Sequence, residues 1–136
     1  MDCLFCKIIA KKIPAEVMYE DAYALGFLDV HPRAPGHTMI IPKAHAENIL
    51  DLPEAEVAPL FSAVRHMTNV LQKVFQPDGF TIGINHGKAS GQAVEHLHIH
   101  IIPRWHTDQG NSIHSVVNNP PQESLAAIAQ KIRKSG

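Results

Sequence analysis

The sequence predicts an α+β fold, with a mainly antiparallel sheet of five strands, one long central helix, and short helices near the N- and C-termini. Five short segments have strand-like sequences bounded by turn residues, and one long segment has the apolar spacing of a helix. The helices are not interleaved with the strands as in repeating βαβ units, which argues against a parallel sheet. At 136 residues, without repeats or linkers, the chain is expected to form one domain over residues 1–136.

The first part of the chain is expected to hold one short helix and three strands. The helix covers residues 3–12, with Asp2 as its cap and Pro14 beyond its end. The strands are predicted at 16–21, 22–30 and 37–42, with a tight turn near Glu20 and Asp21. The loop HPRAPG precedes the third strand, which ends at Pro42.

The long central helix has the clearest pattern. Asp51 and Glu54 are spaced as in a capping box, and Pro53 suits a first turn. Apolar residues then recur at helical spacing, at Val57, Leu60, Phe61, Val64, Met67, Leu71, Val74 and Phe75. This spacing predicts one stripe that faces the core.

The remaining elements are two strands and a final helix. The fourth strand is predicted at 79–85 and the fifth at 94–102, joined by a loop of small residues. The C-terminal helix is predicted at 121–134, with Leu125, Ile128 and Ile132 directed inward.

Composition narrows the class of protein. A net charge of −1 provides no electrostatic signal for binding nucleic acid or an anionic membrane. No apolar run approaches the roughly 20 residues of a transmembrane helix. The N-terminus MDCLFCKIIA lacks the basic start and long apolar run of a signal peptide, so we expect a cytoplasmic protein.

Three of the ten histidines alternate in the stretch EHLHIHIIPRW, at His96, His98 and His100. On a strand, alternate side chains share one face, about 6–7 Å apart, while Leu97, Ile99 and Ile101 face the opposite way. Such a row suits a metal site, or nucleophilic and acid–base chemistry on a phosphate. The scattered His31, His66, His106 and His114 are expected to have no such role.

The loop before this row favours a phosphate pocket. It has the sequence NHGKASGQA, from Asn85 to Ala93. Glycines allow backbone N–H groups to approach an anion closely, and Asn85 and Gln92 add amide donors. The loop is weak evidence alone, but it gains weight beside three histidines.

The stretch from His96 to Ile102 resembles the H-φ-H-φ-H-φ-φ signature of the histidine triad (HIT) family. The resemblance extends to CLFCKI, GFLDVHPRAPGHTMIIPKAH and GQAVEHLHIHIIPR, and so covers nearly the whole chain. It is closest to the small prokaryotic-type branch, near the nucleoside phosphoramidases and dinucleotide hydrolases. The resemblance implies a HIT-like fold and a homodimer whose sheets join edge to edge, with the helix over 53–75 as a contact surface.

The resemblance also implies roles for individual residues. His98 would be the nucleophile that attacks the α-phosphorus, His100 would contact the phosphate, and His37 would support the row. Asp29 would bind the ribose hydroxyls. An apolar slot for the base would consist of Phe5, Ile8, Leu28 and Val30. Contacts to the phosphate and leaving group would come from Asn85, Gly91, Gln92 and Ala93.

Ala93 departs from the family pattern, because many members have Ser or Thr at this position. The missing hydroxyl is expected to weaken activity or shift its preference, while the backbone N–H of Ala93 can still donate a hydrogen bond.

A second constellation is Cys3-x-x-Cys6, which is a common half-site for tetrahedral zinc. The resemblance places the other two ligands at His45 and His96. Zinc held by four protein ligands would be structural, and catalysis would then depend on His98, His100 and His37. The alternative is a pair of reduced cysteines without a metal, and a redox pair is disfavoured because no strand precedes it.

We therefore expect a hydrolase that cleaves the α-phosphate bond of a purine nucleoside phosphoramidate or dinucleoside polyphosphate. It would act through a nucleotidyl-histidine intermediate and release the nucleoside monophosphate. Residues 105–120 are expected to line the mouth of the pocket. Two alternatives stay open: a catalytic metal held by the histidine row, and a nucleotide-binding regulatory or scaffold protein with little turnover.

Overall fold

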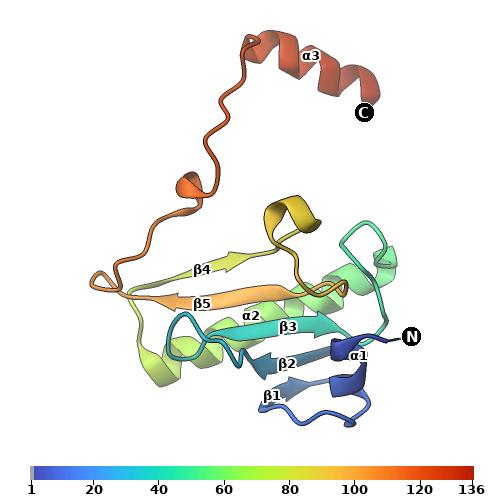
Figure 1. Ribbon diagram of the computed structural model, residues 1–136, viewed down its shortest axis with the longest axis vertical. Helices are drawn as coiled ribbons and strands as arrows, with labels where there is room; N and C mark the ends of the chain where they lie inside the picture. The colour runs from blue at the N-terminus through green and yellow to red at the C-terminus, as the bar shows by residue number, and fades with distance from the viewer. Residues whose placement is uncertain (1) are drawn as a thin grey trace.

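The computed structural model describes residues 2–136 and confirms the α+β prediction. Five strands form one antiparallel sheet in the order β1-β2-β3-β5-β4 (Figure 1). The strands are β1 (Val17–Glu20), β2 (Ala24–Leu28), β3 (Thr38–Pro42), β4 (Gly79–Gly83) and β5 (Ile99–Arg104). The helices are α1 (Leu4–Ile9), α2 (Val57–Phe75) and α3 (Leu125–Ser135). Short 3₁₀ turns lie at Glu54–Glu56, Lys88–Ser90 and Ile113–Ser115.

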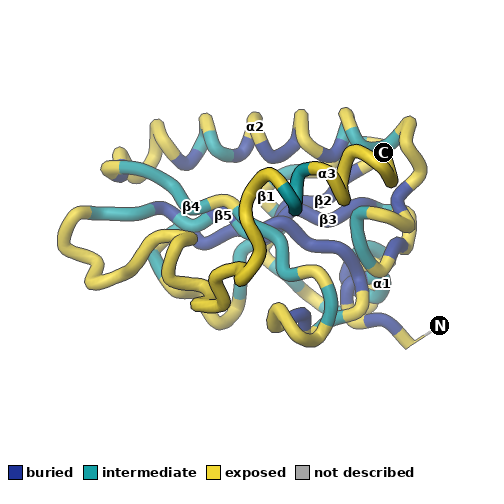
Figure 2. Tube along the Cα trace, turned by 90° about the horizontal axis from the view of Figure 1, so that it is seen from above, coloured by how far each residue is buried: buried dark blue, intermediate teal, exposed yellow. Residues whose placement is uncertain are grey.

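Helix α2 covers one face of the sheet (Figure 2). The core on this side includes Leu60, Val64, Met67 and Leu71 from the helix, packed with Leu97, Ile99 and Ile101. Only part of the predicted stripe is buried, because Phe61, Val74 and Phe75 are at least 39% exposed. The predicted capping box is also absent: a 3₁₀ turn precedes α2, and Glu56 at the N-cap makes no side-chain cap hydrogen bond.

Helix α1 lies on the opposite face of the sheet from α2 (Figure 2). Its Phe5 and Ile8 pack with Leu25, Phe27 and Ile41 in a second core. The helix is shorter than predicted, and its cap is Cys3, whose Sγ accepts the N–H of Cys6 at 3.4 Å. The predicted cap, Asp2, forms an ion pair with Lys7 at 2.6 Å instead.

The turn between β1 and β2 is longer than predicted, so β2 begins at Ala24. The side chain of Asp21 causes this, because its Oδ1 accepts the N–H groups of Tyr23 and Ala24 at 2.7 and 2.8 Å. An aspartate that bonds to the backbone two and three residues ahead favours a turn over an extended strand.

Strand β5 begins at Ile99, so the first two histidines of the row precede the strand and only His100 lies within it. His100 is opposite Met39 of β3 and Gly83 of β4. Its neighbours Ile99 and Ile101 pack with α2, so alternation places His100 on the face of the sheet that α2 does not cover. Leu97, Ile99 and Ile101 are at most 1% exposed and pack toward α2, as the alternation predicts.

After β5 the chain leaves the sheet, and α3 lies away from the rest of the domain (Figure 1). Leu125 is 80% exposed and Ile132 is 67% exposed, so the prediction that they pack inward is wrong for this chain. The helix still forms because Ser124 caps it, its Oγ accepting the N–H of Ala127 at 3.2 Å. No helix within residues 2–136 has the length and hydropathy needed to cross a membrane.

Candidate active site and metal centre

The stretch from His96 to His100 contributes side chains to two separate clusters. His96 lies in a bend before β5 and is directed toward α1, whereas His100 lies on the open face of the sheet. His98 stands between them, and its ring centroid is 5.1 Å from that of His100. His37 and His45 also belong to these clusters. The other histidines are exposed and lie outside both clusters, namely His31, His66, His86, His106 and His114.

The tautomer of His98 follows from its backbone contact. Its Nδ1 lies 2.7 Å from the carbonyl oxygen of His96, which can only accept, so Nδ1 carries the proton. The Nε2 atom of the neutral ring is then unprotonated and has a free lone pair. The side chain is buried, and the Phe5 ring meets it edge-on at a centroid distance of 5.2 Å. His98 is therefore oriented with one nucleophilic nitrogen.

A chain of hydrogen bonds assigns the proton of His100 in the same way. The backbone N–H of Arg33 donates to Nδ1 of His37 at 3.0 Å, so neutral His37 carries its proton on Nε2. That Nε2 lies 2.9 Å from Nδ1 of His100 and donates to it. Neutral His100 must then carry its own proton on Nε2. The site thus contains a free N–H donor beside a free nitrogen lone pair.

Burial keeps the rings of His100 and His37 uncharged. It lowers the pKa of His100 to about 4, with smaller contributions from the neighbouring His98 and His37. Burial also lowers the pKa of His37, against the attraction of Asp29. Both rings are neutral near pH 7, so His100 donates a hydrogen bond without adding positive charge.

Asp29 lies directly beside these rings. Its Oδ2 is 3.5 Å from Nε2 of His37 and 4.0 Å from Nδ1 of His100, while Oδ1 accepts the N–H of His31. Asp29, Leu28 and His37 line a cavity of about 450 Å³ together with the loop from Pro32 to Gly36. A carboxylate at this position has one oxygen available for polar groups of a ligand.

The structure brings only part of the predicted apolar slot to this site. Phe5 is buried between Phe27 and His98, and Ile8 packs in the same core. The side chain of Val30, by contrast, is 78% exposed. Val30 follows the end of β2, where the chain turns away from the sheet.

The loop from Asn85 to Ala93 differs from its predicted role in one important respect. Gln92 donates both amide N–H groups to carbonyl oxygens, of Glu47 at 2.7 Å and Val94 at 3.1 Å, and its Oε1 accepts the N–H of Gly87 at 2.8 Å. Its side chain therefore shapes the loop and has no N–H left for a phosphate. Gly91 has φ +102°, a conformation that favours glycine.

Asn85 and Ala93 lie in different surroundings. Asn85 is half-buried and lines a second cavity beside His100. Ala93 is exposed and lines a cavity of about 360 Å³ together with Cys3 and His45. The position that lacks the hydroxyl thus borders the cysteine cluster.

The second cavity beside His100 has a volume of about 590 Å³ and extends along the open face of β4 and β5. It reaches from Asn85 and His100, past Ile102, to Arg104, with Arg33 also in its wall. The sequence prediction missed both arginines. Alternation along β5 places His100, Ile102 and Arg104 on one face, so the two-residue period would have identified Arg104.

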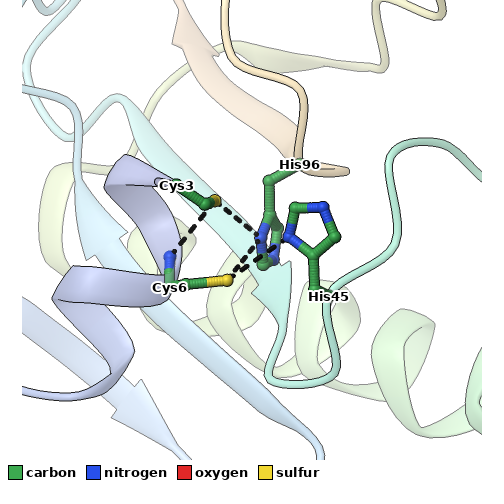
Figure 3. Close-up of side chains that lie close together, drawn as sticks. All are labelled: Cys3, Cys6, His45 and His96. Carbon is green, nitrogen blue, oxygen red and sulfur yellow. Dashed lines mark hydrogen bonds between the residues drawn. The ribbon is translucent and has the colours of Figure 1, made fainter. Parts of the chain in front are cut away.

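Cys3, Cys6, His45 and His96 form the other cluster, and their side chains point toward one another (Figure 3). Their four ligand atoms, two Sγ and two Nδ1, all lie within 4.8 Å of one another. Nδ1 of His96 is 3.4 Å from Sγ of Cys3, and Nδ1 of His45 is 3.3 Å from Sγ of Cys6. The cluster joins α1, the segment after β3, and the segment before β5.

The donor atoms of this cluster suit zinc. Nε2 of His96 donates to the carbonyl oxygen of Pro42 at 2.9 Å, which leaves the Nδ1 lone pair facing the sulfurs. Burial lowers the pKa of His96, so the ring is neutral, as a ligand must be. Two thiolates and two imidazoles match a tetrahedral structural site, with no position open for a water.

Comparisons with known proteins identify the family of this chain. The HIT domain family model matches residues 10–107. The adenylylsulfatase HINT3 of Arabidopsis thaliana is 42% identical over 107 residues, which are 79% of this chain and 54% of that protein. The adenosine 5'-monophosphoramidase hnt1 of Schizosaccharomyces pombe is 32% identical over 132 residues, 97% of this chain and 96% of that protein.

The fold also matches solved structures. The crystal structure of a HIT family member from Bacillus subtilis has a TM-score of 0.88 and 36% identity, covering 98% of this chain and 96% of that one. The family model spans the sheet, α2 and the residues His37, His98 and His100. This chain therefore belongs to the HIT family.

Proposed function

We propose that this protein hydrolyses the bond between the α-phosphorus of a purine nucleotide and its leaving group, with His98 as the nucleophile. The observation that carries the proposal is the hydrogen bond from Nδ1 of His98 to the carbonyl of His96, which leaves Nε2 unprotonated. The relatives named adenylylsulfatase and adenosine 5'-monophosphoramidase support an adenosine nucleotide as substrate, and the second name supports a phosphoramidate. A dinucleoside polyphosphate is proposed from the family resemblance alone.

The reaction has two displacements. Nε2 of His98 attacks the α-phosphorus, and the bond to the leaving group breaks with its electron pair on that group. Water then attacks the phosphorus, the N–P bond breaks, and the nucleoside monophosphate is released. The Nε2–H of His100 is placed to donate to a phosphate oxygen as negative charge develops.

The surrounding residues would bind the nucleotide. Asp29 would accept hydrogen bonds from the ribose hydroxyls, beside the cavity that it lines with Leu28. Phe5 and Ile8 would contribute to the apolar slot for the base, and Asn85 would donate its amide to the phosphate. The backbone N–H of Ala93 would complete the phosphate contacts, whereas that of Gly91 donates to the carbonyl oxygen of Lys88 at 3.0 Å.

This geometry favours a nucleophile over a catalytic metal at the triad. Asp29, His37 and His100 also have ligand atoms close together. However, the two facing imidazole nitrogens are joined by a hydrogen bond, and Nδ1 of His37 is used by a backbone N–H. These nitrogens are therefore engaged with each other and not open toward an ion.

We further propose that Cys3, Cys6, His45 and His96 hold a structural zinc ion. Zinc bound there would link α1 to the sheet and would lie outside the reaction. The protein is also proposed to be a homodimer. Strand β4 lies at an edge of the sheet, and α2 has the exposed apolar side chains Phe61, Val74 and Phe75. Sedimentation analysis would detect the dimer.

The proposed nucleophile is tested by intact-protein mass spectrometry after a brief, acid-avoiding quench with adenosine phosphoramidate. Wild type is expected to carry a nucleotidyl adduct, and His98→Ala is expected to lose both the adduct and turnover, by roughly 10⁴-fold or more. His66→Ala, at an exposed histidine on α2, is the matched control and should behave as wild type. Equal turnover by wild type and His98→Ala would overturn the proposal, and binding without turnover by either would favour a nucleotide-binding protein.

A further inference from the structure

The cavity of about 590 Å³ beside His100 extends away from the proposed nucleotide contacts. Its walls are the open face of β4 and β5, together with the segment after β5 that includes Ile113 and Val116. Leu28 and Asp29 do not line it, since they belong to the cavity of about 450 Å³. If the proposed function holds, a leaving group on the α-phosphorus would enter this larger cavity.

Three charged residues line this cavity, namely Arg33, Arg104 and Asp108. Two of them compensate each other: Nε of Arg104 donates to Oδ2 of Asp108 at 2.7 Å, and Nη2 donates to Oδ1 at 3.2 Å. The guanidinium holds the pKa of the Asp108 carboxyl well below its usual range, so the pair is ionised and internally neutral.

Two further N–H groups of Arg104 are also used. Its Nη1 donates to Oγ1 of Thr81 at 2.8 Å and to the carbonyl oxygen of Asn111 at 2.9 Å. Asp108 in turn accepts the backbone N–H groups of Trp105 and Gly110. Arg104 therefore organises the turn after β5 and is not available as a free cation.

Arg33 is different, because its charge is uncompensated. Its backbone is held by the N–H bond to His37, whereas its side chain is exposed and forms no ion pair within residues 2–136. Arg33 and its neighbour Ala34 line both cavities, so Arg33 lies where the two adjoin. His100 is neutral, which leaves one positive charge in the wall of the larger cavity.

We propose that this cavity is a subsite for an anionic leaving group, a sulfate or a phosphate chain, and that Arg33 selects for it. When His98 attacks the α-phosphorus, the leaving oxygen departs with the electron pair of the broken bond. The guanidinium stabilises that added negative charge, so no proton is required for departure. An amine, by contrast, gains a proton as it leaves and retains no negative charge for Arg33 to stabilise.

The test compares kcat/KM for three adenosine substrates that differ in their leaving group: adenylyl sulfate, diadenosine tetraphosphate, and adenosine phosphoramidate. Arg33→Gln is expected to lower kcat/KM by roughly 10- to 100-fold on the two anionic leaving groups. It should change the phosphoramidate rate by less than about threefold, because the backbone N–H of residue 33 that holds His37 is retained. Arg33→Glu should enlarge the loss on the anionic substrates.

Arg65→Gln is the matched control, since Arg65 is exposed on α2, which packs on the other face of the sheet. Loss on either anionic substrate with the phosphoramidate spared supports the subsite and shows whether it takes sulfate, a phosphate chain, or both. An equal loss on all three substrates, or no loss on any, overturns it.

A binding measurement separates this proposal from the proposed function. Titration calorimetry on His98→Ala compares adenylyl sulfate with AMP, and the double variant with Arg33→Gln should lose any preference for adenylyl sulfate. A preference that persists without Arg33, or that is absent in His98→Ala, overturns the subsite even if the protein has no turnover. Absent turnover alone would contradict only the proposed function.

Discussion

The two clusters supplied by the stretch 96–100 differ in what surrounds them. The cysteine cluster is closed: its four ligand atoms face one another, and they come from three separate segments. The triad site is open: His100 lines the cavity on β4 and β5, and in both His98 and His100 only Nδ1 is hydrogen-bonded within the protein. In both, a hydrogen bond on one nitrogen decides what the other nitrogen can do.

The difference shows how the short segment before β5 can contribute side chains to two different kinds of site. His96 precedes β5 in a bend, and its Nε2 bonds to the carbonyl of Pro42 on β3. Its Nδ1 is thereby turned toward α1 and the cysteines. Two residues later, His98 bonds to the backbone of His96 itself and leaves Nε2 free. The proposed zinc ligand and the proposed nucleophile thus differ in which ring nitrogen the backbone holds, Nε2 in His96 and Nδ1 in His98.

Removal of the cysteine cluster should have the largest effect on stability. Cys3→Ser with Cys6→Ser is expected to lose one zinc per chain and to lower the free energy of unfolding by about 4 kcal/mol or more. Elemental analysis and thermal unfolding measure the two quantities. Two results would contradict a metal site at the cysteine cluster. One is wild-type protein that contains no zinc after expression in zinc-containing medium, and the other is a double variant as stable as wild type.

The open cluster should instead make stability depend on pH. Folding lowers the pKa of His100 to about 4 from about 6.5, so the unfolded chain binds more protons between these values. The stability associated with neutral His100 is complete above about pH 6.5 and is lost as the pH falls toward 4, on the order of 3 kcal/mol. In urea unfolding, His100→Asn should have a smaller pH slope in this window than wild type. Equal slopes would mean that burial does not hold His100 neutral.

The hydrogen bond between His37 and His100 should matter for rate more than for folding. His37→Ala removes the donor that assigns the proton of His100, and kcat/KM is expected to fall roughly 10²-fold. His37→Gln, which retains an amide N–H, should recover part of this loss. Nitrogen chemical shifts of His100 should report a changed tautomer in the alanine variant. An unchanged tautomer with the same loss of rate would assign His37 a different role.

The smallest effect is expected at Ala93, which borders the closed cluster and not the cavity beside His100. Ala93→Ser adds one hydroxyl, and one hydrogen bond is worth about 1 kcal/mol, so kcat/KM should rise by roughly fivefold or less. The change would be measured as kcat/KM with adenylyl sulfate, diadenosine tetraphosphate and adenosine phosphoramidate. An increase of more than about a hundredfold would show that the missing hydroxyl limits the reaction.

The sequence by itself determined the sheet, the long helix, the histidine row and the Cys-x-x-Cys pair, because these depend on local patterns. Period-two alternation buried Leu97, Ile99 and Ile101 and placed His100 opposite them. The Cys-x-x-Cys spacing places two sulfurs on one turn at the start of α1. The resemblance to the HIT family supplied the distant partners His37, Asp29 and His45, which no spacing could have indicated.

Tertiary structure alone decided how those side chains are used. Gln92 was predicted to donate its amide N–H groups to a phosphate, but it donates them to the carbonyls of Glu47 and Val94. Leu125 and Ile132 formed the predicted helix, yet the segment before it carries α3 away from the core. The charge balance that distinguishes Arg33 from Arg104 depends on which carboxylate reaches which guanidinium. Such pairings are contacts between separate segments, and a local pattern does not contain them.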